Sequence, residues 1–320
     1  MLKFVFLIND HGYNKYIYTA AVEGGASAPH IGKWEKLFEL HNAEPLNRYF
    51  ELPFKRIWFH AVVDESKLQK EDEIVFVLYE SFHMSYSRKF ITHYKKKYRN
   101  SKFIYIFSNP AGAYNRRRIE TIKDLLDAIF TFNQEDAVKY GYMLLGAAPF
   151  SLPPQGPCEI ESDVFFIGSD KGRLSLLLAI FEKLSSKGLV CDFWITEVSA
   201  EKQRYADKIH YNQRMTYEEV LQRDAKTRCI IEVLQDGKSY SSIRTTEALF
   251  YHKKLLTTSV TTKECWFYDP DIIQVFSSAD DIDTDFVRKP VDEAKYDGLI
   301  SDSYSQFKEF VVDALSKKNG

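Results

Sequence analysis

Residue types that can bind a nucleotide gather between positions 235 and 247. The apolar run Cys229–Leu234 has the length of a buried parallel strand, and a helix is expected from about Ile243. Ligands bind where such strands end, because the free N–H groups of the following helix favour phosphate. A carboxylate one turn into the helix can accept ribose hydroxyls, so the pattern predicts a nucleotide site. Its polar members are Ser239, Ser241, Ser242, Arg244 and Glu247.

Four side chains that could act as a general base follow the two clearest strands of the first half. Asp10 and His11 come directly after the first apolar run, and Glu80 ends the next one with His83 three residues on. A base positioned to take a proton from a hydroxyl contributes about 10²–10⁴-fold to a rate. We take Asp10 and Glu80 as the first candidates, and His11 and His83 as the next.

A basic window occupies the middle of the first half. No acidic residue occurs between Ser81 and Ile119. A patch of this kind attracts an anionic membrane surface or a lipid diphosphate, although a solvated helix face would have the same composition. The pattern falls short of an RNA-binding signature, so no nucleic-acid partner is expected. The ten basic residues are Arg88, Lys89, Lys95, Lys96, Lys97, Arg99, Lys102, Arg116, Arg117 and Arg118.

The elements that must position these residues alternate between strands and helices in both halves. In the first half we expect strands at 3–8, 72–80, 102–108 and 129–133, and helices at 85–100, 119–128 and 135–140. The stretch 19–61 is less legible, with helical material around 34–40 and 54–59. Strands separated by helices predict a parallel sheet with right-handed crossovers.

The proline-rich stretch Ser151–Pro157 is the predicted linker, and the alternation restarts after it. Thr216 and Glu219 form a capping-box pattern that opens a helix ending near Lys226. The other expected elements are strands at 163–167, 192–196, 229–234, 255–259 and 272–276, a glycine-bearing turn at 168–173, and helices at 174–186, from 243 and at 304–315.

The length of the chain leaves room for two domains or one large one, and its hydrophobic content supports large cores. The chain has 320 residues, 45% of them hydrophobic, and a net charge of −2. No apolar stretch approaches the roughly 20 residues that a membrane span requires, and the apolar start is too short for a signal peptide. The four cysteines are scattered without pairs, which indicates a reducing cytoplasm and no zinc site.

Two Rossmann-like halves joined by a proline-rich linker resemble a GT-B glycosyltransferase. The most specific segments are Ile243–Ser259, with its EAL helix, and Phe165–Leu184, with a strand, a glycine-containing turn and a helix. The sequence as a whole, including Thr131–Tyr142, is similar to those of bacterial capsule and O-antigen biosynthesis proteins. The resemblance implies two parallel-sheet domains facing a cleft: an acceptor-side domain at 1–152, a nucleotide-sugar donor domain at 158–298, and a C-terminal helix at 299–320 that packs back on the first domain.

The resemblance also assigns roles to donor-side residues. Glu247 would bind the ribose of the donor, Arg173 or Lys171 would contact its diphosphate, and Gly168 would allow close approach of the backbone. Many retaining members carry a second Glu eight positions before the first, where this chain has Ser239. The stereochemistry of transfer therefore stays open.

The diphosphate could instead be held by the polar residues of the 235–247 segment. These are Lys238, Ser241, Ser242 and Arg244. Basic side chains and a helix dipole can neutralise a diphosphate leaving group, so we expect no metal and no cofactor. The acidic stretch Asp281–Asp285 is interpreted as a solvated turn.

The resulting prediction is a cytoplasmic glycosyltransferase that moves a sugar from a UDP- or GDP-linked donor to a growing cell-surface glycan. A lipid-linked acceptor would be held near the inner face of the plasma membrane by the basic window, and the base would lie across the cleft from the donor. Two alternatives stay open. One is another nucleotide-sugar enzyme such as an epimerase, and the other is a non-catalytic GT-B-like assembly subunit.

Overall fold

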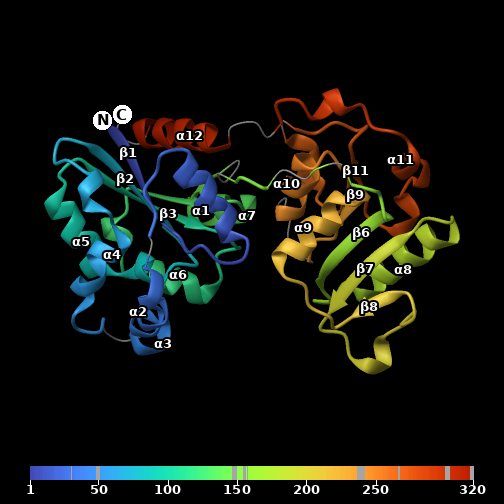
Figure 1. Ribbon diagram of the computed structural model, residues 1–320, viewed down its shortest axis with the longest axis horizontal. Coiled ribbons are helices and arrows are strands. Elements are labelled where there is room, and N and C mark those ends of the chain that lie inside the picture. The colour runs from blue at the N-terminus through green and yellow to red at the C-terminus, as the bar shows by residue number, and fades with distance from the viewer. Residues whose placement is uncertain are drawn as a thin grey trace. The chain divides into compact units, whose positions relative to one another are not determined.

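The computed structural model describes residues 1–29, 31–47, 51–145, 150–153, 156, 158–235, 242–265, 267–299 and 303–317. The chain divides into two compact units (Figure 1). Unit 1 comprises residues 1–151 with 302–320, and unit 2 comprises residues 152–301. Each has its own parallel sheet.

The sheet of unit 1 contains five parallel strands in the order in which they occur in the chain. These are β1 (Leu2–Leu7), β2 (Glu73–Tyr79), β3 (Ser101–Phe107), β4 (Ala128–Thr131) and β5 (Met143–Leu144). Ser27 forms a parallel bridge to Val5, on the edge of β1 that β2 leaves free. The strands consist almost entirely of buried apolar residues, as expected of a parallel sheet covered on both faces.

The crossovers of unit 1 supply most of its helices. They are α1 (Asn14–Glu23), α2 (Glu35–Asn42), α3 (Glu44–Asn47), α4 (Phe59–Val62), α5 (Arg88–Lys97), α6 (Ala113–Glu120) and α7 (Gln134–Tyr140). An aromatic core packs under α5, where Phe76 of β2 stacks on Phe103 of β3 at 4.5 Å between ring centroids.

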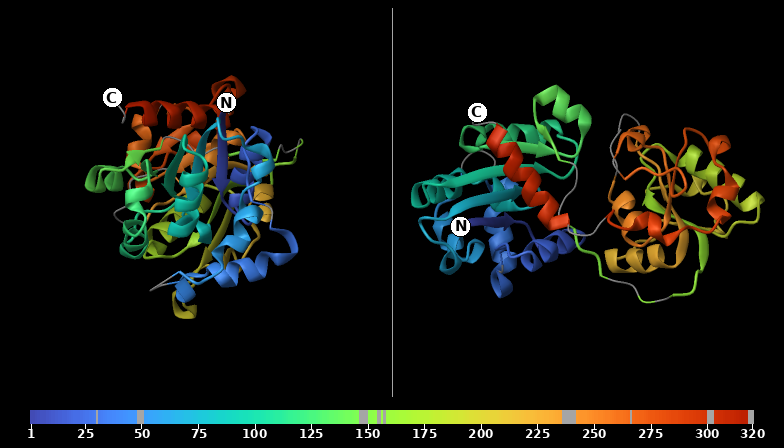
Figure 2. Two further views of the ribbon diagram at one scale, coloured as in Figure 1. Left: turned by 90° about the vertical axis from the view of Figure 1, so that its left-hand side faces the viewer. Right: turned by 90° about the horizontal axis from the view of Figure 1, so that it is seen from above.

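The C-terminal helix α12 (Ser303–Lys317) covers the other part of this sheet (Figure 2). Phe307 lies 6.3 Å from Phe4 and 5.6 Å from Phe6, measured between ring centroids. A Cβ atom on Gly24 would come within 1.9 Å of the Tyr304 ring, so the end of α1 approaches α12 closely because residue 24 has no side chain.

Unit 2 has six parallel strands in the order β11-β10-β9-β6-β7-β8. They are β6 (Ser162–Ser169), β7 (Cys191–Thr196), β8 (Ile209–Tyr211), β9 (Thr227–Glu232), β10 (Lys254–Thr257) and β11 (Ile273–Val275). The helices are α8 (Leu174–Ser186), α9 (Tyr217–Ala225), α10 (Ile243–Phe250) and α11 (Thr284–Arg288). The prediction of two all-parallel α/β sheets is thus confirmed, and so is the capping box of Thr216 and Glu219 that opens α9.

The helix predicted at 119–128 is wrong. The helix α6 lies earlier and ends at Glu120, a short 3-10 turn covers Lys123–Leu125, and Ala128 already belongs to β4. Ile119 and Ile122 have helical spacing, but both are buried at the turn that joins α6 to the sheet. The Asp127 carboxylate accepts the backbone N–H of Phe103 at 2.7 Å and so fixes the start of β4. Helix α1 and strand β8 were not predicted.

No helix among the described residues is long and apolar enough to cross a membrane.

Replacing Phe307 with Ala should lower the free energy of unfolding of unit 1 by about 3–5 kcal/mol, because a buried phenyl ring is removed from the sheet face. Val312→Ala on the same helix is the control, since Val312 is exposed and should change stability by less than about 1 kcal/mol. Urea unfolding checks both, and equal effects of the two substitutions would contradict the packing of α12.

Candidate functional sites

The sheet of unit 2 has a topological switch point between β6 and β9. From β6 the chain proceeds to β7 and β8 on one side, and it then returns to place β9 on the other side. The connections leave these two carboxyl ends in opposite directions, which opens a crevice where ligands bind in open α/β sheets. A hollow of about 190 Å³ lies at this place. Its polar lining consists of Lys171, Arg173, Glu232, Gln235, Ser242 and Arg244.

Arg173 joins the two strand ends at the switch point. Its guanidinium donates to the carbonyl oxygen of Ser169 at 2.9 and 3.1 Å and also to the carbonyl oxygen of Val233. Gly168 leaves room for this arrangement, because a Cβ atom there would lie 2.7 Å from Nη2 of Arg173. Burial lowers the pKa of Arg173 below its ordinary value, although an arginine remains charged.

Glu232 fixes the start of α10 at the same hollow. It is buried at the end of β9, where its carboxylate accepts the backbone N–H of Ser242 at 2.7 Å and the hydroxyl of Thr245 at 3.2 Å. The carboxylate also accepts the hydroxyl of Thr257 at 2.5 Å. Three elements therefore meet at one carboxylate, and the N-terminal turn of α10 is held beside the hollow.

Arg244 is the centre of a buried charged cluster. Its guanidinium contacts Glu247 at 2.5 Å and Asp224 at 3.4 Å, and Glu247 also accepts the hydroxyl of Tyr217 at 2.5 Å. Both carboxyl groups have no exposed side-chain surface. Burial raises the pKa of Asp224 to about 6 and raises that of Glu247 well above its usual range. One guanidinium thus faces two carboxyl groups, and burial favours the protonated form of each.

The buried position of Glu247 changes its expected role. The side chain points to Arg244 and Tyr217 and is not part of the lining of the hollow. Glu247 therefore acts in this conformation by holding Arg244, whereas a direct contact to a ribose was expected. Lys171 and Ser242 do line the hollow. Lys238, Ser239 and Ser241 lie outside the described residues.

Unit 1 has a corresponding switch point at the carboxyl end of β1. The chain goes from β1 through α1 to the bridge at Ser27, and it then crosses to β2 on the opposite side. A hollow of about 90 Å³ lies there, and it is lined by the segments that follow β1, the Ser27 bridge and β2. Its polar lining is Asn9, Asp10, Glu35, Glu39, Ser81 and His83.

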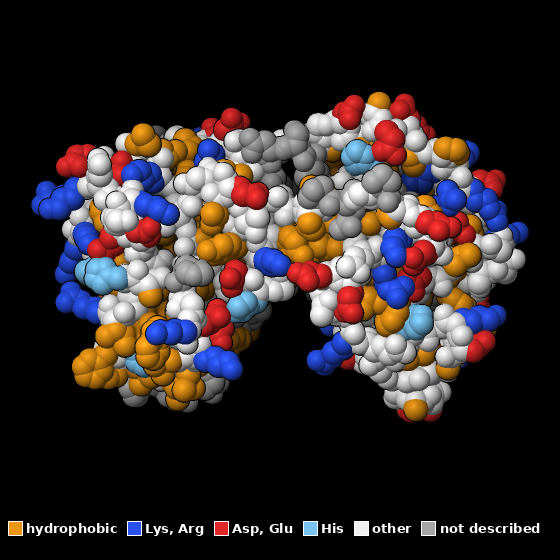
Figure 3. Space-filling view, in the orientation of Figure 1, with side chains coloured by type: hydrophobic (Ala, Val, Ile, Leu, Met, Phe, Trp, Pro, Cys, Tyr) orange, Lys and Arg blue, Asp and Glu red, His pale blue; other side chains and the backbone are white. Residues whose placement is uncertain are grey.

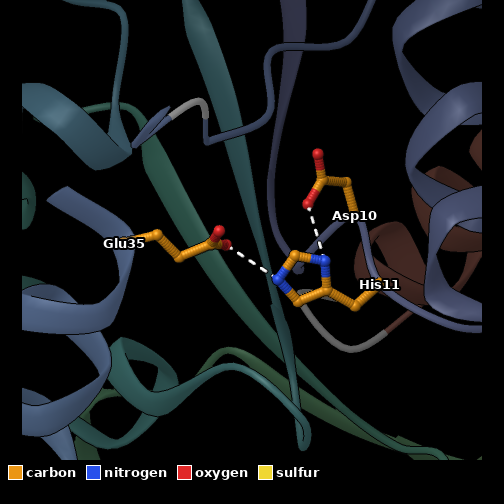
Figure 4. Close-up of side chains that lie close together, drawn as sticks. All are labelled: Asp10, His11 and Glu35. Carbon is orange, nitrogen blue, oxygen red and sulfur yellow. Dashed lines mark ion pairs between the residues drawn. The ribbon is translucent and has the colours of Figure 1, made fainter. Parts of the chain in front are cut away.

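His11 lies between the carboxylates of Asp10 and Glu35, which line this hollow (Figure 4). Its Nδ1 atom is 3.2 Å from Asp10, and its Nε2 atom is 2.9 Å from Glu35 at the start of α2. About half of the His11 side chain is exposed, so an incoming substrate can reach the imidazole. A neutral imidazole donates to only one of the two carboxylates, and the other nitrogen is then free to accept a proton.

Glu80 and His83 occupy more enclosed places. The Glu80 carboxylate accepts the backbone N–H groups of Ser108 and Asn109 at 3.2 and 3.1 Å and the side-chain amide of Asn115. Burial raises the pKa of Glu80, but these hydrogen bonds engage both oxygens in closing the β3–α6 loop. Burial, together with the charge of Arg118, lowers the pKa of His83, so the neutral imidazole is favoured.

The prediction from the sequence missed Glu35, Asn14, Glu232 and Asp224. Asn14 is buried and donates to Asn9 at 2.8 Å and to Ser81 at 3.0 Å, which ties together the ends of β1 and β2. Glu232 carried a readable signal, because a carboxylate inside the apolar run CIIEVL must find partners. The other residues meet their partners only through the fold.

Half of the basic window is engaged in ion pairs. Arg88 pairs with Asp124, Lys89 with Glu51, Lys95 and Lys102 with Asp127, and Lys97 with Glu65. Arg116 and Arg118 lie over the rings of Tyr140 and Tyr86. The window as a whole is thus not a free cationic surface. Its exposed members without an ion pair among the described residues are Lys96, Arg99 and Arg117.

No protein-family model and no curated protein matches this sequence. Solved structures give low-identity likenesses, one of them to the protein TarM with 11% identity and a TM-score of 0.45. That match covers 79% of this chain and 55% of TarM, so the chain spans about half of TarM's length. A crystal structure of an S. aureus TarM mutant in complex with UDP and alpha-GlcNAc-glycerol is matched with a TM-score of 0.42.

Two further solved structures match with similarly low sequence identity and TM-score. The glycosyltransferase SnogD from Streptomyces nogalater is 11% identical, with a TM-score of 0.42 and coverage of 97% of this chain and 98% of SnogD. A protein from Listeria monocytogenes assigned as a UDP-N-acetylglucosamine 2-epimerase is 9% identical, with a TM-score of 0.41 and coverage of 74% and 72%. Because all these scores lie below 0.5, the fold is defined by the strand order and not by these likenesses.

The charged cluster predicts a pH dependence of stability. The native state holds a proton on Asp224 and on Glu247 more tightly than the unfolded chain does. For Asp224 this contribution is complete below about pH 4 and is lost as the pH rises through about 6, and Glu247 contributes in the same direction. Glu247→Gln should therefore be at least as stable as the wild type at pH 8, because the amide mimics the protonated carboxyl. Glu247→Ala should lose about 2 kcal/mol, since it deprives Arg244 and Tyr217 of a partner.

Urea unfolding at pH 5 and pH 8 measures these differences. If Gln and Ala were equally destabilising at pH 8, Glu247 would have to be ionised in the native state.

Proposed function

We propose that the protein is a glycosyltransferase that moves a sugar from a UDP- or GDP-linked donor to a growing cell-surface glycan. The observation that carries this proposal is the hollow at the switch point of unit 2, where Lys171, Arg173 and Arg244 converge beside the start of α10. Arginine and lysine side chains with backbone N–H groups are the donors that suit a diphosphate, which is the leaving group of such a reaction. With three cations at the site, the proposed transfer does not require a metal ion.

A nucleoside fits the same place for a second reason. Ligands of open parallel sheets bind at the switch point, and the apolar lining from Phe166, Ile167 and Ile231 provides a floor for the uncharged part of the donor. Glu247 would support binding of the donor's diphosphate indirectly, since it forms an ion pair with the guanidinium of Arg244.

The proposed base is His11. Asp10 can accept the proton on Nδ1 and orient the ring, and Nε2 is then the nitrogen that takes a proton from the acceptor hydroxyl. In the present conformation Glu35 lies 2.9 Å from Nε2, at the place where that hydroxyl would bind. Glu80 serves as a structural carboxylate in this proposal, because its oxygens already accept hydrogen bonds from the β3–α6 loop.

Donor binding is tested by titrating UDP and GDP into the wild type and into three variants. Lys171→Ala and Arg173→Ala should each weaken the binding of a nucleoside diphosphate about tenfold or more, because a charge-assisted hydrogen bond is worth about 1.5–3 kcal/mol. Gly168→Ala should do the same without removing a charge, since its Cβ atom displaces the Arg173 guanidinium.

Arg228→Ala is the matched control, because Arg228 pairs with Asp163 at 3.2 Å and is not part of the lining. Calorimetry gives the affinities. Unchanged affinity in all three variants would place the nucleotide elsewhere.

Catalysis is tested by the release of free UDP or GDP from nucleotide sugars. His11→Asn should reduce turnover by about 10²–10⁴-fold while nucleotide affinity stays constant, because only the proton transfer is removed. Asp10→Asn should have a smaller effect of the same kind, and Glu80→Gln should act chiefly on stability. Normal turnover in His11→Asn would mean that another residue is the general base. If the wild type released no UDP or GDP from any donor, the alternative of a non-catalytic assembly subunit would be favoured.

A further inference from the structure

Exposed hydrophobic side chains gather on two segments of unit 1 that pack together. One segment is Trp34 with the helix α2, which includes Leu37, and the other is Phe54 with the 3-10 helix Lys55–Trp58 that precedes α4. The most exposed are Phe54 at 77%, Ile57 at 63%, Leu40 at 62% and Trp34 at 56%. Figure 3 shows the corresponding concentration of hydrophobic surface over the α2–α3 part of the unit. Single exposed apolar residues are common, but a contiguous group marks a surface that is covered in use.

The segments form a rigid support for this group. Phe38 of α2 packs edge-to-face on Trp58 at 5.5 Å between ring centroids, and the Trp58 indole donates to His41 at 2.8 Å. The ammonium of Lys55 donates to the side chain of Asn42 at 2.7 Å. The exposed tips are therefore held by a buried layer behind them.

Phe54 is also strained. Its φ angle is +61°, in the left-handed region that a bulky L-residue rarely adopts, and this costs about 1–2 kcal/mol. A hydrophobic side chain held in a strained conformation gains nothing from exposure to water. Strain at a loop tip of this kind points to a function of the side chain itself.

A basic groove of about 790 Å³ adjoins the tips of Phe54 and Ile57. Six of its ten lining residues are basic or histidine and none is acidic; the full lining is Phe54, Lys55, Arg56, Ile57, Phe59, Lys89, Thr92, His93, Lys96 and Lys97. Lys97 is paired with Glu65, whereas Arg56 and Lys96 are exposed and have no ion pair among the described residues. The groove therefore presents free positive charge directly beside apolar side chains.

We propose that this platform, consisting of Trp34, Leu37, Leu40, Phe54 and Ile57 with Arg56 and Lys96, docks unit 1 onto an anionic lipid bilayer. The apolar tips enter the boundary between headgroups and acyl chains, and the two cations meet lipid phosphates. Charge complementarity selects the bilayer as the occupant. Its anionic headgroups match the basic groove, and the apolar layer beneath them matches the exposed hydrophobic side chains. The proposal does not rest on sugar transfer, since no residue of the platform lines either hollow.

Vesicle co-sedimentation tests the proposal with phosphatidylcholine vesicles that contain 30% phosphatidylserine, and with vesicles of phosphatidylcholine alone. The wild type should bind the anionic vesicles and release them as salt is raised. The double variant Phe54→Ser, Ile57→Ser should bind at least tenfold more weakly. Arg56→Glu and Lys96→Glu should each lower binding fivefold or more, since one basic residue near an anionic surface contributes about fivefold in affinity.

Two substitutions serve as matched controls. Val138→Ser removes an equally exposed hydrophobic side chain on α7, and Lys70→Glu reverses an exposed charge before β2. Neither should change vesicle binding. Circular dichroism of each variant distinguishes lost binding from lost folding.

Tryptophan fluorescence provides a local readout. Trp34 is exposed, Trp58 and Trp194 are buried, and Trp266 lies outside the described residues. A blue shift on mixing with anionic vesicles that disappears in Trp34→Phe is therefore assigned to Trp34. Absence of binding to anionic vesicles at low salt would overturn the proposal, as would binding that is insensitive to Phe54→Ser, Ile57→Ser. A dimer in light scattering that this double variant converts to a monomer would identify a second copy as the occupant and would also overturn it.

Discussion

Every strand pair in the two sheets is parallel, and this constraint determines where the molecule can have functional sites. Parallel pairing places all carboxyl ends of a sheet along one edge, and the connecting helices must then cover the faces. A crevice opens only where two neighbouring connections leave in opposite directions. In unit 2 that place is fixed by the β6–β9 neighbourhood, and in unit 1 by the bridge of Ser27 to β1. Both hollows lie at these positions, and both contain the polar residues that follow the strands.

The two hollows differ in the charge of their lining. The unit 2 hollow combines two arginines and a lysine with the start of a helix. The unit 1 hollow combines two glutamates, an aspartate and a histidine, and its residues Asp10 and Glu35 contact His11. Buried polar side chains hold the segments that form each hollow: Glu232 fixes the start of α10, and Asn14 joins the ends of β1 and β2. Their burial costs desolvation energy, which their hydrogen bonds offset.

The same need for coverage explains α12. The crossovers of unit 1 leave part of its sheet uncovered, and the last helix of the chain supplies the missing apolar layer through Phe307 and its neighbours. The close approach at Gly24 shows how specific this packing is. The platform of Phe54 and Ile57 differs from the sheet face that α12 covers. Its apolar side chains lie on the surface of the unit and have no covering element among the described residues.

The sequence by itself determined the class of fold and most of the elements. Short apolar runs such as Cys229–Leu234, alternating with helical periodicity, are enough to specify parallel sheets, because a strand buried on both faces needs no polar positions. The capping box at Thr216 was equally local. Helix 119–128 failed because the spacing of Ile119 and Ile122 fits a buried turn as well as a helix face.

Only the tertiary structure decided which residues form the sites. Glu247 lies in the expected helix, but its carboxylate is buried against Arg244, and Arg244 also contacts Asp224 from a different helix. His11 gained Glu35 from α2 as a second carboxylate, and half of the basic window pairs with acidic residues outside it, among them Asp127, Asp124 and Glu65. Ion pairs and burial depend on distances between segments far apart in the chain. Composition and spacing describe each segment alone, so they could indicate the strand ends but not which side chains meet there.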